Sequence, residues 1–141
     1  MSRFYAIGEA NLALPEVERI LAALRDQRGE LIALRDRVVA AAPPDDEAPT
    51  ADVAERIRLL RLGMQGLIDQ MQAGVARLVE MDIMLRDISS GLIDFPALVS
   101  GRPIWLCWRL GETDVAHWHP HDEGFDTRRS LDDLPATSRL V

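Results

Sequence analysis

The residues best suited to chemistry lie in the last third of the chain, from Asp94 onward. All three histidines fall within one short stretch, at His117, His119 and His121. On an extended strand His117 and His119 point to one face, because side chains alternate along the strand. Imidazoles at that spacing can share a divalent metal ion, and we expect Glu112 to complete the set, with Asp94 and Asp122 as alternative carboxylates. The competing interpretation is that these histidines are surface or hydrogen-bonded residues without a metal.

Two arginines and a cysteine accompany the histidines. Arg109 and Arg128 carry planar guanidinium groups that can recognise an anion, but the excess of acids favours structural ion pairs with Asp94, Asp114 or Asp122. Cys107 is either a nucleophile or, as is usual for a cysteine in an apolar strand, a small core residue. If the protein is an enzyme, its candidate catalytic residues are Asp94, Arg109, Glu112, His119 and Arg128.

The composition limits the function. The chain has 141 residues and a formal net charge of -7, and it contains no lysine, which together with abundant alanine, arginine and leucine indicates a bacterial source. Nucleic-acid binding needs a basic footprint, so it is not expected. No apolar run approaches the roughly 20 residues of a membrane span, and the N-terminus lacks the apolar core of a signal peptide. The single cysteine excludes an intramolecular disulfide and fits a cytoplasmic protein.

A long helical hairpin is the element that must carry this region. The first helix is predicted over residues 15–41, with Pro15 in its first turn and an apolar residue every seven positions. Residues 43–50 contain three prolines and three acids, so they form the hairpin tip. The second helix is predicted over residues 52–82, with Asp52 and Glu55 as a capping box. Its a/d seam consists of Ile57, Leu60, Met64, Leu67, Met71, Leu78 and Met81.

The second helix has more apolar surface than one partner helix can cover. A second apolar set lies beside the seam, at Ile68, Val75 and Val79. Either the N-terminal arm or the C-terminal region covers it, or two hairpins associate into a four-helix bundle. We expect the second arrangement, a homodimer through the helices. Gly74 interrupts the seam, either at a close approach of the two helices or as a weak point.

After residue 82 the pattern changes from helical to extended. Strands are predicted at 83–88, 92–96, 103–109 and 114–119, although a helix continuing to Ile88 is an alternative. All three tryptophans lie in the last pair, at Trp105, Trp108 and Trp118. About four short strands would form a small antiparallel sheet, since a lone hairpin is marginal in water. The expected fold is one α+β domain over residues 1–141, mainly α, with a small β-region at 83–131 that carries the site and a loose tail at 132–141.

The register of the last hairpin decides which side chains share a face. With a two-residue turn, Arg109 lies opposite Asp114, and the sheet separates Cys107 from His119. With a turn one residue longer, Cys107 lies opposite His117 instead. We expect the two-residue turn, because it pairs Arg109 with Asp114 across the strands.

Several motifs resemble those of one family. They are GLIDFP at 91–96, LCWRLGE at 106–112, Trp118-His119, and Gly124-Phe125 with Arg128, together with Glu9-Ala10-Asn11 and Leu14-Pro15 near the N-terminus. These residues resemble the prokaryotic family known as domain of unknown function 2203, over nearly the whole chain. Among the histidines, only His119 falls on these motifs. The resemblance implies a strand at 83–88, since the family tends to have glycine where Asp82 stands here, but it brings no established reaction.

Two functional hypotheses follow. The first is a cytoplasmic, homodimeric helical-hairpin protein that acts as an interaction or ligand-binding module, with an unknown ligand or protein partner. The second is a metal-dependent enzyme, hydrolase-like, with a divalent ion held by His119, Glu112 and Asp94. In that case Arg109 or Arg128 would bind the substrate. Convergence of these side chains on one pocket is the observation that would favour a functional site.

Overall fold

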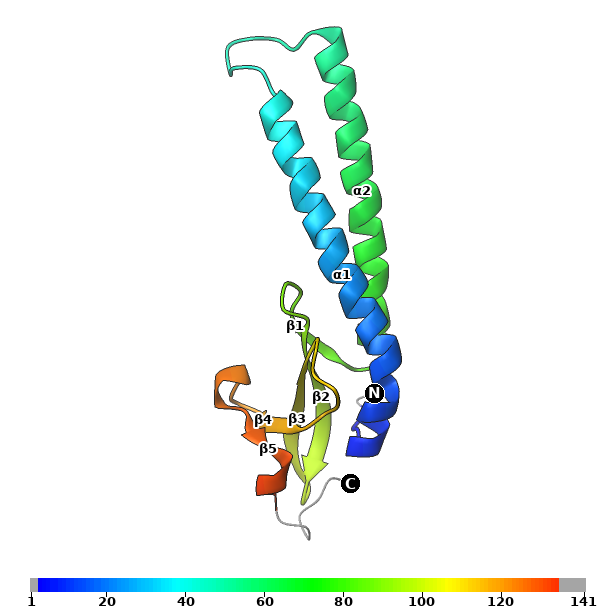
Figure 1. Ribbon diagram of the computed structural model, residues 1–141, viewed down its shortest axis with the longest axis vertical. Helices are drawn as coiled ribbons and strands as arrows, with labels where there is room; N and C mark the ends of the chain where they lie inside the picture. Colours follow the sequence, from blue (N-terminus) through cyan, green and yellow to red (C-terminus); the bar gives the residue numbers. More distant parts are fainter. Residues whose placement is uncertain (1–2, 135–141) are drawn as a thin grey trace.

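The computed structural model describes residues 3–134 as a long helical hairpin with a small sheet packed beside its base (Figure 1). Helix α1 runs from Ile7–Ala41 and helix α2 from Ala51–Glu80, and the proline-rich tip joins them. In this part of the chain the sheet is antiparallel and has five strands in the order β1-β2-β3-β4-β5. The predicted class, α+β and mainly α, is therefore confirmed. The predicted loose tail lies mostly outside the described residues.

Helix α1 begins before the predicted residue 15, so that Pro15 lies inside it. A proline inside a helix removes one helical hydrogen bond, so its position in the sequence predicts the start of a helix. The first turns are instead held by the β-region. The Asn11 side-chain oxygen accepts a hydrogen bond from the Val115 backbone N–H at 2.8 Å. Just ahead of the helix, the Tyr5 backbone N–H donates to the Pro96 carbonyl at 2.7 Å. These contacts with the β-region therefore stabilise helical turns on the N-terminal side of Pro15, the residue at which the helix was expected to begin.

The N-cap of helix α2 is Thr50, whose hydroxyl accepts a hydrogen bond from the Val53 N–H at 3.3 Å. The prediction of a capping box formed by Asp52 and Glu55 was wrong. Glu55 instead pairs with Arg58 at 2.7 Å on the helix surface. Thr50 was overlooked because it adjoins a proline and was assigned to the tip, although threonine is a strong N-cap residue.

The other end of helix α2 shows how the scaffold turns into the sheet. Asp82 has a φ of 58°, in the left-handed region that commonly ends a helix. The Ile83 N–H then donates to the Leu78 carbonyl at 2.9 Å, which satisfies one of the free helix carbonyls. Strand β1 follows at Met84–Asp87. The helix therefore does not continue to Ile88, and the position where the resembling family tends to have glycine is the turning point.

The remaining strands are β2 (Leu92–Val99), β3 (Arg102–Arg109), β4 (His117–Pro120) and β5 (Arg129–Ser130). In the β3–β4 pair Cys107 lies opposite His117, and Trp105 lies opposite His119. The predicted two-residue turn was therefore wrong, and the predicted return strand at 114–119 begins later, at His117, and ends at Pro120. The connection is longer because Val115 is buried against the helices and hydrogen-bonded to Asn11. That contact holds the chain away from β3 until His117.

The two faces of the sheet have different surroundings. One face packs on the base of the hairpin and forms the core with Ile93, Phe95, Ala97, Ile104, Leu106 and Trp108 of the sheet and Ala10, Leu14, Val17, Leu21 and Leu24 of α1. Burying each large apolar side chain contributes about 1.5–3 kcal/mol. The opposite face carries polar residues and is where a site can form. The core thus fixes the strand positions from behind.

The two helices approach closely at Gly74. A Cβ atom there would lie 3.3 Å from the Leu24 Cδ2 atom and 3.5 Å from the Ile20 Cγ2 atom. Of the two interpretations of this glycine, close approach is therefore the correct one. Farther toward the tip the buried apolar residues of α2 are only Leu60 and Leu67. Within residues 3–134 no helix is long and apolar enough to cross a membrane.

Candidate functional site

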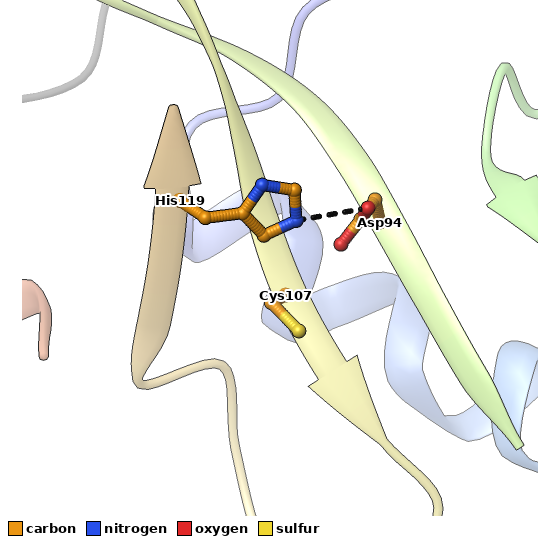
Figure 2. Close-up of side chains that lie close together, drawn as sticks. All are labelled: Asp94, Cys107 and His119. Atoms are coloured by element: carbon orange, nitrogen blue, oxygen red, sulfur yellow. Dashed lines mark hydrogen bonds and ion pairs between the residues drawn. The ribbon is translucent and has the colours of Figure 1, made fainter. Parts of the chain in front are cut away.

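The polar face of the sheet brings together one side chain from each of three adjacent strands. Asp94 of β2, Cys107 of β3 and His119 of β4 lie close together, with the His119 ring directed at Asp94 (Figure 2), and a carboxylate oxygen, the sulfur and a ring nitrogen all lie within 4.8 Å of one another. The register explains this meeting, because Asp94 and His117 both lie opposite Cys107, and His119 is two positions along the same face. The side chains are buried, with relative exposures of 2%, 1% and 1%.

His119 is held by hydrogen bonds at both ring nitrogens. Its Nδ1 lies 2.9 Å from the Pro120 carbonyl oxygen, so this nitrogen is assigned as the N–H donor. Its Nε2 lies 3.0 Å from Asp94 Oδ2, so the second ring nitrogen also has a polar partner. The ring therefore has a fixed orientation, with Nε2 directed into the cluster.

Asp94 has one well-paired oxygen and one unpaired oxygen. Oδ2 accepts a hydrogen bond from the Arg86 Nε at 2.8 Å as well as facing His119. Oδ1 is buried and has no hydrogen-bond partner among residues 3–134. Buried polar atoms in native proteins are nearly always paired, so an unpaired carboxylate oxygen indicates a partner from outside the chain.

Cys107 is poorly suited to act as a nucleophile. Burial raises the pKa of the thiol to about 12, and the neighbouring Asp94 carboxylate acts in the same direction. A hydrogen bond with Arg128 lowers the pKa but does not offset burial. The thiol is therefore protonated near neutral pH, whereas the thiolate is the reactive form.

A second polar group lies farther along the same sheet face. Arg128 donates to Glu112 at 3.0 Å, and Glu112 also lies 3.7 Å from the His117 Nδ1. Burial alone would raise the pKa of Glu112, but hydrogen bonds from Arg128 and from the Arg109 backbone N–H outweigh it and hold the pKa below its ordinary value. The Arg128 guanidinium lies 4.4 Å from the centre of the Phe125 ring. This arrangement has the features of a structural ion pair.

The predicted site residues fall into these two neighbouring groups, which the contact between Cys107 and Arg128 joins. Asp94 and His119 belong to the first, and Glu112, Arg128 and His117 to the second. The predicted ligands His119, His117 and Glu112 are therefore not gathered around one point; in the described part of the chain the donor trio is Asp94, Cys107 and His119.

Arg109 lies apart from both groups. It is exposed, with its guanidinium 5.3 Å from the centre of the Phe125 ring. The predicted pair between Arg109 and Asp114 is not formed within residues 3–134, because Arg109 lies opposite Leu92 of β2 and Asp114 lies in a loop.

Arg86 is the site residue that the sequence reasoning missed. It reaches Asp94 from β1, and its guanidinium lies 4.9 Å from the centre of the Trp105 ring. The signal was available in strand alternation: Met84 lies opposite Asp94, and Arg86 is two positions farther along β1. The same alternation, in the correct register, would have placed Cys107 in the cluster.

A cavity of about 310 Å³ opens beside the cluster, and Asp94 forms part of its wall. The ring of His121 stacks on Trp105 at a centroid distance of 5.0 Å, and the Trp105 Nε1 donates to the His121 carbonyl at 3.2 Å. These contacts fix the segment that follows β4. The other principal wall residues are Arg86, Leu92, Asp122 and Phe125.

Comparison with protein-family models matches residues 3–131 to the family described as Uncharacterized conserved protein (DUF2203). The resemblance noted from the sequence motifs is thus confirmed. No curated protein and no solved structure matches the chain.

Proposed function

Because the chain belongs to the DUF2203 family, whose description states no activity, we propose a function from its own geometry: a ligand-binding module carried on a helical hairpin. The observation that carries the proposal is the Asp94 carboxylate, which is buried, has an unpaired Oδ1 among the described residues and lines a cavity. An unpaired buried polar atom costs about 1–3 kcal/mol. A ligand that pairs with this carboxylate would recover that free energy.

The cavity sets the chemistry of the ligand. Its volume of about 310 Å³ suits a small molecule at the low end of the usual range of ligand pockets. The carboxylate is an acceptor, so the ligand must present a hydrogen-bond donor or a positive charge to Asp94. Arg86 adds a positive charge to the wall, Asp122 and Glu123 add negative charges, and Leu92 and Phe125 add apolar surface. These features suit a small polar molecule.

Binding fits the observed side chains better than thiol catalysis. The Cys107 thiol has a pKa raised to about 12, which removes it as a nucleophile near neutral pH. Both ring nitrogens of His119 have hydrogen-bond partners other than Cys107, so the ring is not paired with the thiol as its base. The alternative of a metal-dependent enzyme has one observation in its favour, the trio of metal-ligand types in the cluster.

Native mass spectrometry of untagged protein tests ligand binding. We expect the gently purified protein to carry a bound small molecule, or to gain one from a panel of small polar metabolites. The Asp94→Asn variant should lose this mass shift, while Asp126→Asn, a change at an exposed aspartate that does not line the cavity, should retain it. A wild-type protein without any such shift would contradict the proposal, as would equal loss in both variants.

We also propose that two copies associate through their hairpins. A groove of about 400 Å³ runs along the outer side of the hairpin, lined by Leu31, Ile68, Met71, Gln72, Val75 and Ala76. Val79, the third member of the second apolar set, is 64% exposed and lies on the same face of α2 as Ile68, eleven residues away. Exposed apolar side chains on one face of a helix are typical of interfaces. Light scattering at micromolar concentration tests the association, and a monomer mass would reject it.

A further inference from the structure

We propose that Asp94, Cys107 and His119 together bind one divalent ion of the zinc class. The proposal does not depend on a small molecule in the neighbouring cavity. It differs from the ligand set expected from sequence, His119 with His117 and Glu112, because the fold places those residues in different groups.

The distances suit a single ion. Zinc binds sulfur at about 2.3 Å and nitrogen or oxygen at about 2.0–2.2 Å, so neighbouring donors in a tetrahedral site lie roughly 3.3–3.8 Å apart. The three donor atoms lie within 4.8 Å of one another, and the shortest contact, between His119 Nε2 and Asp94 Oδ2, is 3.0 Å. Small side-chain rotations are sufficient to place an ion between them, because the donors come from adjacent strands in register.

The donor types select the class of ion. Thiolate and imidazole favour zinc and similar transition metals, whereas magnesium and calcium prefer oxygen ligands alone. One carboxylate, one imidazole and one thiolate make a mixed set that zinc accepts. Binding of the ion would displace the Cys107 thiol proton and the proton of the His119–Asp94 hydrogen bond to solvent, as metal coordination of a thiol does. The resulting thiolate and carboxylate would balance the charge of the ion within a buried site.

Two features indicate that the donors are prepared for an ion. The His119 Nδ1–H donates to the Pro120 carbonyl, which directs Nε2 into the cluster, as the second contact of a metal-binding histidine commonly does. The Asp94 carboxylate, 98% buried by its relative exposure of 2%, keeps Oδ1 without a partner in the described part of the chain. If the cluster were only a buried hydrogen bond beside a small core cysteine, an internal water would have to pair with that oxygen, and the metal titration below distinguishes the two cases.

Three protein ligands leave a fourth position. Because Asp94 also lines the cavity of about 310 Å³, this position can be reached from the cavity by water or by a small molecule. Catalytic and ligand-exchanging zinc sites have this arrangement, whereas structural zinc sites are closed by four protein ligands. Asp94 is the member of the trio that lines the cavity, so a fourth ligand would enter beside its carboxylate.

Cobalt titration provides a direct test, because cobalt occupies zinc sites and a cobalt–thiolate bond produces an intense charge-transfer absorption. Untagged full-length protein is stripped with a chelator and titrated with Co²⁺, and then with Zn²⁺ to displace it. We expect one equivalent of Co²⁺ with the thiolate band, followed by loss of the band when Zn²⁺ is added. The Cys107→Ser variant should lose the band. The affinity of His119→Gln for Co²⁺ should fall by about 100-fold or more, since loss of a residue that only hydrogen-bonds to a metal ligand already lowers affinity about 10-fold to 100-fold.

His117→Gln is the matched control, because His117 lies on the same strand as His119 and is not in the trio. It should bind Co²⁺ as the wild type does. Absence of the thiolate band in the wild type would overturn the proposal, whatever the variants do. Loss of binding in His117→Gln with retention in His119→Gln would overturn it as well, and would move the ion to the second group. Far-ultraviolet circular dichroism shows that each variant remains folded.

Discussion

At the scale of single residues, the most informative contact is the buried pair of Asp94 and His119. It is not a surface ion pair of small effect, because both side chains are almost completely buried. Removing one partner leaves the other buried without its hydrogen bond, and this lowers the free energy of unfolding strongly. This contact makes the cluster sensitive to truncation whether or not an ion is bound.

We therefore predict that Asp94→Ala lowers the free energy of unfolding by about 3 kcal/mol in the presence of a chelator. Asp126→Ala, at an exposed position, should change it by less than about 0.5 kcal/mol. Urea denaturation followed by circular dichroism measures both. A loss below about 1 kcal/mol for Asp94→Ala would show that the pair contributes little to folding.

Glu112 supplies a pH-dependent prediction. Its pKa in the folded protein is below the ordinary value of 4.5, because hydrogen bonds from Arg128 and Arg109 outweigh the opposing effect of burial. A lowered pKa means that Glu112 adds stability above about pH 4.5, and that this contribution is lost as the pH falls through the folded-state pKa. The wild type should therefore exceed Glu112→Gln in stability at pH 7, and the difference should shrink steadily below pH 4.5.

Thermal unfolding of both proteins across that pH range measures the difference. The Glu123→Gln variant serves as a control, since its partner Arg129 is about half exposed at 47% and the pair should contribute little. A constant difference between wild type and Glu112→Gln from pH 7 to pH 3 would contradict the prediction.

How far the site could be predicted depends on where each signal resides. Asp94 and His119 could be predicted as site residues from the sequence, because both are polar residues within the predicted strands and fall on recognisable motifs. The position of Cys107 was not accessible, because a shift of one residue in the β3–β4 register moves it to the other face. That register depends on Val115 and Asn11, which are joined across most of the chain. A short-range rule about turns cannot report such a contact.

At the scale of elements, the end of helix α2 determines where the sheet begins. Asp82 adopts a φ of 58°, which is strained for most residues but free for glycine. Asp82→Gly and Asp82→Ala both remove the carboxylate that accepts a hydrogen bond from the Arg3 N–H. Their difference therefore isolates the backbone conformation. We predict that the glycine variant is more stable than the alanine variant by about 1 kcal/mol in urea denaturation; equal stabilities would argue against a left-handed residue at this position.

The contact between the helices predicts opposite effects at two glycines of α2. At Gly66 a Cβ atom would meet nothing within 4 Å, so Gly66→Ala should raise stability by about 0.5–1 kcal/mol through helix propensity. At Gly74 the same change brings Cβ to 3.3 Å from Leu24, and the larger Gly74→Leu should destabilise the hairpin. Thermal denaturation compares the variants, and a tolerated Gly74→Leu would mean that the helices are farther apart than described.

The elements themselves were largely predictable, because their signals are local. The heptad seam, the prolines of the tip and the change to an extended pattern after residue 82 each lie within a few turns of chain. The start of α1 was not predictable, because Pro15 alone suggests that a helix begins there. The turns before Pro15 depend on Asn11 and Tyr5, whose hydrogen-bond partners lie in the β-region. Strand β5 was missed for a similar reason: at two residues it exists through its pairing with β4.

At the scale of the whole molecule, the hairpin has two parts with different surroundings (Figure 1). Near its base the sheet covers α1, and the two together form the core. Toward the tip the two helices extend beyond the sheet, and within residues 3–134 they have only each other as partners. Leu59 and Val39 in this part are 55% and 69% exposed. A hairpin used only as a support for the sheet would not need this length or this apolar outer surface.

The proposed association of two hairpins can be tested by placing a charge in the outer groove. Ile68 is half-buried there and is not part of the core around the sheet, so Ile68→Glu should weaken the dimer while leaving the fold intact. A buried unpaired carboxylate costs several kcal/mol, so we predict a dissociation constant raised at least about 100-fold. Ala73→Glu places the same charge on the opposite side of α2 and should leave the mass unchanged, because residues five positions apart point about 140° from each other. Sedimentation equilibrium measures both variants, and equal weakening by the two would show that net charge, not the groove, controls association.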